Sequence, residues 1–336
     1  MTSRPENGPT WVDSSAVRRV CSACADLTAQ LQRVIVGQDT VVQELLWCLL
    51  AGGHGLLVGV PGLAKTLLVR TLAETLGLDF NRIQFTPDLM PADIVGTEVF
   101  HEDRVTGERH LRFVPGPIFA KVVLADEINR TPPKTQSALL EAMQERQVTV
   151  GGQRHILPDP FFVLATQNPI EQEGTYPLPE AQRDRFMFEI RVKYPREDEE
   201  FQIIRRTTGA PAPPIGQTAT PTDLVEFQKI VRQIPVADHV VRFAMSLTRR
   251  TRREEPASPE YIRQYVTWGA GPRGSQCLVL AAKARAASHG RECAVVEDVR
   301  AVALPALRHR LITNYQAQAD GWTTDRIIER LLAETE

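Results

Sequence analysis

The sequence has few features of a secreted, disulfide-bonded or membrane-spanning protein. Its 336 residues include five cysteines, an odd number scattered along the chain, which argues against a disulfide framework and favours free thiols. The longest apolar run, 45–51, is far shorter than the roughly 20 residues that cross a bilayer. The first twenty residues have no apolar stretch typical of a secretory signal. We therefore expect a cytoplasmic protein without membrane spans.

An excess of one charge is also lacking. The 39 lysine and arginine residues almost balance 41 aspartate and glutamate residues, which gives a net charge of −2. This balance excludes a broadly basic nucleic-acid coat, although a local basic groove would not show in the sum. The apolar share of 43% excludes wholesale disorder. A chain of this length is expected to form about two domains.

Local patterns divide the chain into an α/β half and a helical half. Short apolar runs at 55–58, 122–125 and 161–165 alternate with helical stretches, as expected for strands buried on both faces of a parallel sheet. Segments 97–113 and 148–156 contain the turn pairs Thr106-Gly107 and Gly151-Gly152 and are predicted to be inserted β-hairpins.

The domain prediction follows from these patterns. In the second half, helices are predicted at 222–234, 238–248, 259–269, 275–288 and 323–333. The predicted parts are a tail and helix at 1–33, an α/β core at 34–200, a proline-containing linker at 201–222 and a small all-α domain at 223–336.

A phosphate-binding loop is predicted after the first apolar run. The run 55–58 leads into Gly59-Val60-Pro61-Gly62-Leu63-Ala64-Lys65-Thr66 and then into a helix that begins near Leu67. Loop amides and the helix N-terminus attract phosphates, Lys65 adds a full charge, and Thr66 offers a hydroxyl to Mg²⁺. Ala64 replaces the last glycine of the pattern, and we expect ordinary backbone angles there. The alternative is a glycine-rich turn without nucleotide.

Polar side chains follow the other two predicted strands. Asp126 and Glu127 come after 122–125, and Asn168 follows 161–165. Asp126 is expected to hold the hydration shell of Mg²⁺, Glu127 to activate the attacking water, and Asn168 to bridge that water and the γ-phosphate. Taken alone, the acidic pair is typical of a helix cap and the asparagine before Pro169 of a turn, but the phosphate loop favours the catalytic interpretation.

Two arginines and one cysteine pair also stand out. Arg273 is predicted in the first turn of a helix, where the helix dipole disfavours a cation, and Arg185 follows the third strand closely. Surface ion pairs are the alternative for both. Cys21 and Cys24 form a C-x-x-C pair without a second pair at zinc spacing, so we interpret them as part of a helix face.

Together these motifs resemble one family. The order GVPGLAKT, VVLADEINRTPPKTQSALLEAMQE, FFVLATQNP, LPEAQRDRF and GAGPRGS is similar to that of the MoxR family of AAA+ ATPases, from about Val34 to the last helix. The resemblance implies a P-loop NTPase core with a parallel sheet and two hairpin insertions, followed by an all-α lid domain. It implies ATP and Mg²⁺ as cofactors.

The resemblance also implies residue roles. Lys65 and Thr66 become Walker A residues, Asp126 and Glu127 the Walker B pair, and Asn168 sensor 1. The ATP-binding set then comprises Val36, Gly37, Gln38, Gly59, Pro61, Gly62, Leu63, Ala64, Lys65, Thr66, Leu67 and Asp126, of which Thr66 and Asp126 bind Mg²⁺, Asp126 through water.

Two further roles involve arginines. The resemblance makes Arg185 an arginine finger that acts on the neighbouring subunit's ATP, and Arg273 sensor 2. Arg183 departs from the family pattern, which has an apolar residue there. Because residues two apart on a helix point to different faces, we predict that only Arg185 is the finger.

The family resemblance implies a homo-oligomer, expected to be a hexameric ring, that remodels a protein client. It also implies a partner with a von Willebrand factor A domain, which we expect on a separate protein because no Asp-x-Ser-x-Ser pattern occurs in this chain. Two alternatives are a nucleic-acid remodeller, for which the basic segment 249–253 would supply charge, and a slow nucleotide-dependent assembly scaffold. Nucleic acid is disfavoured because Glu254 and Glu255 follow at once.

Overall fold

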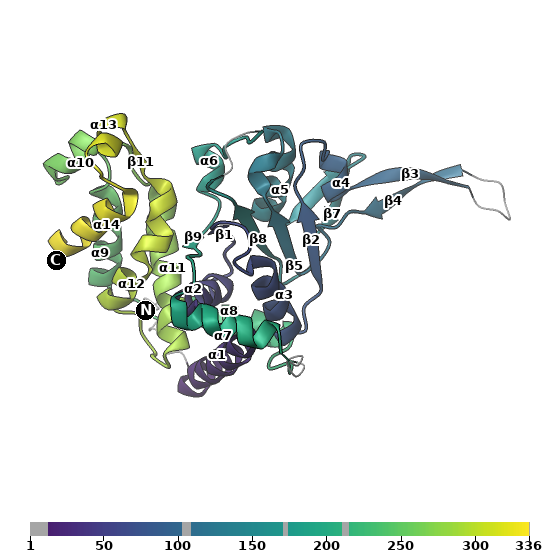
Figure 1. Ribbon diagram of the computed structural model, residues 1–336, viewed down its shortest axis with the longest axis horizontal. Helices are drawn as coiled ribbons and strands as arrows, with labels where there is room; N and C mark the ends of the chain where they lie inside the picture. Colours follow the sequence, from purple (N-terminus) through teal and green to yellow (C-terminus); the bar gives the residue numbers. More distant parts are fainter. Residues whose placement is uncertain (1–12, 103–108, 171–173, 210–214, 336) are drawn as a thin grey trace, which may run out of the picture. The chain divides into compact units, whose positions relative to one another are not determined.

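The structure is a computed structural model that describes residues 13–102, 109–170, 174–209 and 215–335 (Figure 1). Its residues separate into two compact units. An α/β unit comprises Leu27–Leu45 and Gly53–Pro221, and a mainly helical unit comprises Leu46–Gly52, Thr222–Glu336 and the described part of Met1–Asp26. Among the described residues, no helix is both long enough and apolar enough to cross a membrane.

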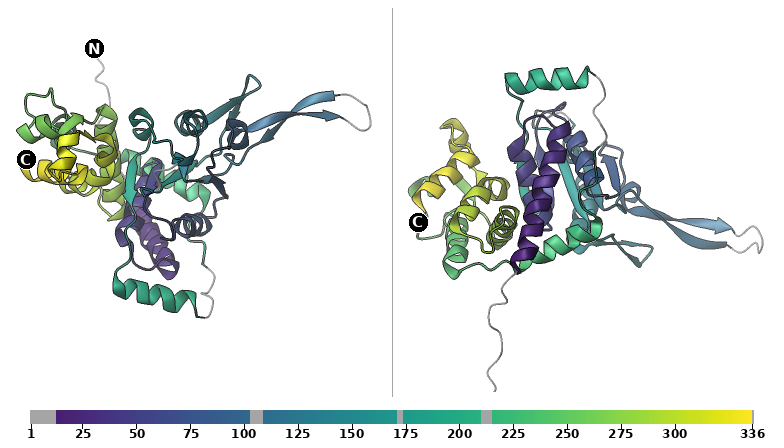
Figure 2. Two further views of the ribbon diagram at one scale, coloured as in Figure 1. Left: turned by 45° about the horizontal axis from the view of Figure 1, so that its top comes forward. Right: turned by 90° about the horizontal axis from the view of Figure 1, so that it is seen from below.

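A five-stranded parallel sheet forms the centre of the α/β unit (Figure 2). Its strand order is β2-β5-β8-β1-β9, and the strands are β1 (Gly55–Val58), β2 (Phe80–Gln84), β5 (Val122–Asp126), β8 (Phe162–Gln167) and β9 (Phe188–Arg191). All five residues of β5 are buried, as expected for a strand with both faces covered. The three predicted strands are thus confirmed. Strands β2 and β9 lack such continuous apolar runs and were not predicted.

Helices and one short turn precede, connect or follow these strands. They are α2 (Asp39–Leu50), α3 (Lys65–Thr75), α4 (Pro91–Val95), η1 (Ile128–Arg130), α5 (Pro133–Glu145), α6 (Glu180–Arg183) and α7 (Glu197–Thr207). Ile94 of α4 and Leu139 of α5 share one buried cluster with Val123 and Val163 of the sheet. This cluster packs α5 against β5 and β8, the strands that lead to the acidic pair and to Asn168.

A buried histidine joins three elements of this core. His54 accepts a hydrogen bond from the Val163 amide at Nδ1 (3.0 Å), and its Nε2 lies 3.1 Å from the Met143 carbonyl oxygen. Burial lowers the pKa of His54 to about 4. A neutral imidazole that donates at one nitrogen and accepts at the other therefore ties the start of β1 to β8 and to the end of α5.

Both predicted hairpins are present. The first pairs β3 (Gly96–Glu102) with β4 (Arg109–Pro115) and extends away from the sheet (Figure 1), and the second pairs β6 (Gln147–Val150) with β7 (Gln153–Ile156). Gly151 and Gly152 have φ of 57° and 79°, as a two-residue hairpin turn requires. The predicted Thr106-Gly107 turn lies outside the described residues. Rings of Phe113 and His155 stack with centroids 3.8 Å apart, so the two hairpins contact each other.

The second unit is mainly helical, as predicted. It contains α8 (Pro221–Gln233), α9 (Asp238–Arg249), α10 (Glu260–Tyr265), α11 (Pro272–Ser288), α12 (Val296–Leu307), η2 (Arg308–Arg310), α13 (Tyr315–Ala319) and α14 (Thr324–Glu334). The long N-terminal α1 (Ser14–Val34) buries Val17 and Val20 in this unit. The prediction of one helix over 259–269 was wrong, because α10 ends at Tyr265 and β10 (Val266–Trp268) then pairs with β11 (Ile312–Thr313). The β-branched and aromatic residues of β10 favour a strand.

Helix α7 covers the first part of the segment that composition predicts as a linker, 201–222. Its residues Glu197–Thr207 form a capped helix, in which the Glu199 carboxylate accepts a hydrogen bond from the Arg196 amide at 2.9 Å. Acidic residues in its first turn and arginines in its last turn complement the helix dipole. The linker prediction, which rested on the prolines after residue 210, therefore missed a helix that ends just before these prolines. The domain boundaries stay a prediction.

Candidate nucleotide-binding site

The predicted phosphate loop connects β1 to α3. A Cβ atom added at Gly59 would lie 2.7 Å from the Val192 carbonyl oxygen, so a larger residue does not fit there. Gly62 has φ of 84° and open space where its side chain would be, and both Pro61 and Gly62 are exposed. Glycine thus allows close packing at one end of the loop and a left-handed turn at the exposed end.

Ala64 corrects one prediction. Its φ of 57° and ψ of 23° are left-handed, directly before α3 begins at Lys65. The expectation of ordinary backbone angles was therefore wrong. An alanine in this conformation costs about 1 kcal/mol relative to glycine, so the loop holds this backbone shape despite a residue that disfavours it.

The two residues after Ala64 begin α3. The Lys65 ammonium donates a hydrogen bond to the Gly59 carbonyl oxygen at the other end of the loop. Thr66 is half-buried, whereas Leu67 is exposed. A single ammonium group therefore closes the loop, and the α3 N-terminus lies beside it.

Asp126 is the better buried residue of the acidic pair. Its Oδ1 accepts a hydrogen bond from the Thr166 hydroxyl (2.5 Å), and its Oδ2 accepts two from Arg82, at 2.9 Å from Nε and 2.7 Å from Nη2. Arg82 lies on β2, whose residue Gln84 is paired in register with Asp126. Both neighbouring strands therefore fix this carboxylate.

Glu127 points its carboxylate to other partners. It has a left-handed φ of 58°, and its amide donates to the Thr166 hydroxyl at 2.8 Å. Its Oε2 accepts a hydrogen bond from Gln84 Nε2 at 2.7 Å and lies 3.2 Å from Arg130 Nε. The backbone turn after Asp126 thus separates two adjacent carboxylates into two environments, which suits two different tasks.

Asn168 lies at the same sheet edge, just after β8. Its Oδ1 accepts a hydrogen bond from the Ile170 amide at 3.3 Å. Its Nδ2 is buried and has no hydrogen-bond partner within the described residues. Because an unpartnered buried donor is costly, this nitrogen fits a site that a polar ligand completes.

The structure separates the two candidate finger arginines. Arg183 ends α6 and lies 3.2 Å from the carboxylate of the buried Glu189. Glu189 also pairs with Arg191 at 3.2 Å. The half-buried Arg185 side chain makes no hydrogen bond or ion pair in the described parts of the chain. Arg183 therefore has a structural partner that Arg185 lacks.

The remaining predicted residues lie outside this sheet edge. Val36, Gly37 and Gln38 connect α1 to α2, with left-handed φ of 66° at Gly37 and 61° at Gln38. A Cβ at Gly37 would lie 2.5 Å from Glu199 Cδ, so α7 packs directly on this segment. Arg273 is the second residue of α11 and belongs to the helical unit. The structure therefore unites the phosphate loop, the acidic pair and Asn168 at one sheet edge.

Sequence reasoning missed four residues that contact the acidic pair: Arg82, Gln84, Arg130 and Thr166. Arg82 and Gln84 are two apart on β2 and so share one face. The alternation of side chains along β2 was the available sequence signal. It identifies contacts with Asp126 and Glu127 only if β2 is known to pair with β5. Thr166 belongs to the quoted FFVLATQNP motif and lies two residues before Asn168.

The C-x-x-C pair has no counterpart in this site. Cys21 and Cys24 lie on α1 as free thiols, and burial raises the pKa of Cys24 to about 12. Across the described residues, no cluster of three or more metal-ligating side chains occurs.

Comparison with known proteins decides the family. A family model described as the ATPase family associated with various cellular activities (AAA) matches residues 54–188, and one described as an AAA lid domain matches residues 260–331. Chaperone MoxR1 of Mycobacterium tuberculosis is 46% identical over 90% of this chain and 79% of its own length. The chain belongs to the MoxR family of AAA+ ATPases. The resemblance found in the sequence is thereby confirmed, and the chain is an ATPase with a nucleotide-binding core.

Two further comparisons agree with this assignment. YeaC of Bacillus subtilis is 41% identical over 90% of this chain and 91% of its own length. A solved structure from Cytophaga hutchinsonii is 40% identical, with a TM-score of 0.88 over 96% of this chain and 97% of that one. The predicted α/β core with hairpins and a helical lid is confirmed by these matches.

Proposed function

We propose that this MoxR-family ATPase is a Mg²⁺-dependent remodelling motor whose catalytic centre is the sheet edge described above. The observation that carries the proposal is the separation of Asp126 and Glu127 beside the phosphate loop: one carboxylate is held by Arg82 and Thr166, the other by Gln84 and Arg130. A purely structural cap would not need two carboxylates with separate partners.

The phosphates of ATP would bind at the loop. The loop amides, Lys65 and the α3 N-terminus supply positive charge, while Val36, Gly37 and Gln38 would lie near the adenine. Thr66 and Asp126 offer the hard oxygen ligands that suit Mg²⁺, Asp126 through a water molecule. When bound, Mg²⁺ offsets phosphate charge.

Hydrolysis needs a base, a positioned water and compensation of charge. Glu127 would accept the proton of the attacking water, and the unpartnered Nδ2 of Asn168 would donate to that water or to the γ-phosphate. Arg273 would report the γ-phosphate to the lid. Arg185 would act on ATP bound to a neighbouring copy, a role supported by its lack of a partner in the described chain, whereas Arg183 pairs with Glu189.

An arginine that acts between copies implies an assembly, which we propose to be a hexameric ring. One of its relatives is named a chaperone, which supports a protein client and, from the family, a separate partner with a von Willebrand factor A domain. The basic segment 249–253 gives little support to a nucleic-acid remodeller. Arg249 pairs with Glu255 at 2.9 Å, and Arg250 and Arg252 donate to Thr335 Oγ1 and to the Ala270 carbonyl oxygen.

Mixing two inactive variants tests the site and the assembly together. Arg185→Ala should bind ATP but lose about 10³- to 10⁵-fold in turnover, the range of in-trans arginines in phosphoryl transfer, and Lys65→Ala should fail at ATP binding. A mixed ring contains interfaces where an intact loop meets an intact Arg185, so turnover should recover. Absence of recovery in rings shown to be mixed would contradict the in-trans role. Arg183→Ala is the matched control, because it keeps the loop and Arg185 and loses only the ion pair with Glu189, so it should keep turnover without Lys65→Ala.

A further inference from the structure

Helix α7 has one anchored face and one open face. Its Glu199 packs on Gly37, and Arg206 donates to the carbonyl oxygens of Gln32 (3.2 Å) and Arg33 (3.4 Å). No residue of α7 is buried, and Phe201 and Ile204 are 62% and 54% exposed. A helix fixed by its polar face that presents large apolar side chains to solvent is an incomplete packing surface.

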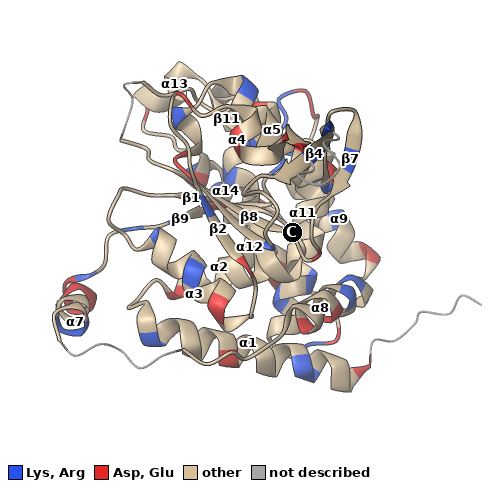
Figure 3. Cartoon of the chain, turned by 90° about the vertical axis from the view of Figure 1, so that its right-hand side faces the viewer, with Lys and Arg blue, Asp and Glu red and all other residues tan. Residues whose placement is uncertain are grey.

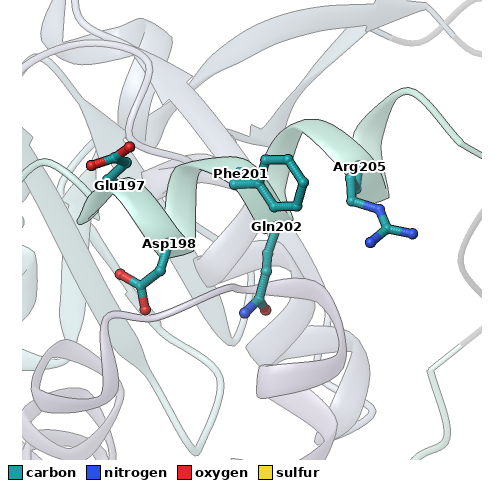
Figure 4. Close-up of a pocket in the computed structure, with 5 residues that line it drawn as sticks. All are labelled: Glu197, Asp198, Phe201, Gln202 and Arg205. Atoms are coloured by element: carbon teal, nitrogen blue, oxygen red, sulfur yellow. The ribbon is translucent and has the colours of Figure 1, made fainter.

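The first turns of the open face are also acidic, while Arg205 lies nearer its end with its guanidinium 5.9 Å from the Phe201 ring centroid. Glu197, Glu200, Phe201 and Ile204 are spaced by three or four residues and so share one side of the helix. Glu197 and Glu200 have no basic partner in the described parts of the chain. Figure 4 shows Glu197, Phe201 and Arg205 along α7, where residues of this helix line a hollow of about 860 Å³. Figure 3 shows that α7 carries both acidic and basic residues.

The helical unit carries a surface with the opposite charge. A groove of about 750 Å³ has an apolar floor that includes Val241 and Met245 of α9 with Val279 and Leu280 of α11. Arg232 and Arg252 also line this groove. Neither pairs with a carboxylate within the described residues, and Arg252 Nε donates to the Ala270 carbonyl oxygen. We call these residues the lid groove.

We propose that the open face of α7 in one copy docks in the lid groove of the next copy. Phe201 and Ile204 would cover the apolar floor, while Glu197 and Glu200 would meet Arg232 and Arg252. The two surfaces are complementary: α7 has carboxylates without a basic partner beside exposed apolar side chains, and the lid groove has guanidinium groups without a carboxylate partner beside apolar side chains. Among the possible occupants, a second copy is favoured because this charge complementarity occurs within one sequence.

Two different surfaces that bind each other form a heterologous contact. Such contacts build closed rings when the rotation between copies closes. The inference rests on the proposed ring and names the surfaces that would hold it together. It does not involve the phosphate loop, the acidic pair or Arg185.

Cross-linking can identify the surfaces directly. Benzoylphenylalanine in place of Phe201 is activated by light in a mixture of ¹⁴N- and ¹⁵N-labelled protein, and cross-linked peptides are identified by mass spectrometry. The proposal expects mixed-isotope products between residue 201 and α9 or α11. Products within one chain only, or mixed products at other elements, would overturn it.

Variants then measure the contribution of each surface. F201S/I204S should raise the dissociation constant of self-association in sedimentation by about tenfold or more, since buried anchors dominate interfaces. I156S is the matched control, because Ile156 is 81% exposed on β7. E197R and R232E should each weaken association, and the double variant should restore it. Circular dichroism checks that all variants are folded.

The outcomes separate this inference from the proposed ring. Unchanged association of F201S/I204S, or failure of the double charge reversal to restore it, would overturn the α7 contact while the ring stands. Wild-type protein that stays monomeric at high concentration with ATP would overturn both.

Discussion

An arginine holds a buried aspartate in each unit, but the two sites differ in how closed they are. Asp126 at the nucleotide edge is bound by Arg82, whose side chain is 49% exposed. Asp298 in the helical unit is fully buried and is bound by Arg285 at 2.5 Å, by Arg291 and by the Val295 amide at 3.0 Å. The same type of ion pair therefore suits two purposes. The solvent-exposed Arg82 leaves Asp126 able to exchange this partner for a ligand, whereas the buried Asp298 holds α11 and α12 together.

The largest expected effect lies at the open edge. Glu127→Gln keeps the shape of the side chain but removes the carboxylate that we propose as the base, so hydrolysis should fall by about 10²- to 10⁴-fold while ATP binding and the melting temperature stay near wild type. Turnover assays beside nucleotide titration check this. Near-normal turnover would remove Glu127 as the base and would weaken the distinction between the two sites.

A smaller effect, on stability instead of activity, is expected at the closed site. Asp298→Asn leaves Arg285 and Arg291 without a carboxylate in a buried setting, which should lower the free energy of unfolding by about 3 kcal/mol. Urea unfolding followed by circular dichroism measures this loss. Glu226→Gln is the control in the same unit, because its pair with Arg19 is exposed and should contribute less than about 1 kcal/mol. Equal losses would contradict the contrast.

Acid titration sharpens the same comparison. Burial alone would raise the pKa of Asp298, but hydrogen bonds from Arg291, Val295 and Arg285 outweigh it and lower that pKa. The unfolded chain then takes up the proton at higher pH than the folded one. The stability from this carboxylate is complete above the unfolded pKa and is lost as the pH falls through the folded pKa. The free energy of unfolding of the Asp298→Asn variant should therefore fall less on acidification than that of the wild type. Urea unfolding at several pH values measures this difference.

The grouping of the candidate site residues at one sheet edge was largely predictable because these residues directly follow strands with strong local signals. The phosphate loop follows the buried β1, and Asp126 and Asn168 follow β5 and β8, so parallel pairing alone brings them to one edge. Ala64 was misjudged because its left-handed angles follow from loop closure, which no local pattern records.

Other features depended on long-range pairing. Arg82 reaches Asp126 only because β2 lies beside β5, and β2 has a mixed polar sequence without a strong strand signal. Helix α12 was missed because it contains Pro305 in its interior, a residue that disfavours helices. The Asp298 network joins α11 to α12 across a loop, so its pairing could not be read from spacing.

The smallest effect tests whether Arg82 competes with the metal for Asp126. Both its Nε and Nη2 donate to Oδ2 of this carboxylate, so binding of hydrated Mg²⁺ must displace or share these bonds. Because Arg82 is half exposed, the pair contributes up to about 1 kcal/mol, and Arg82→Met should tighten Mg²⁺–ATP binding about two- to fivefold. Binding of ATP in the presence of EDTA should not change. Arg70→Met is the matched control, since exposed Arg70 pairs with Glu74 within α3. Weaker Mg²⁺–ATP binding in Arg82→Met would mean that Arg82 instead holds Asp126 in place for the metal, and the open site would then resemble the closed one.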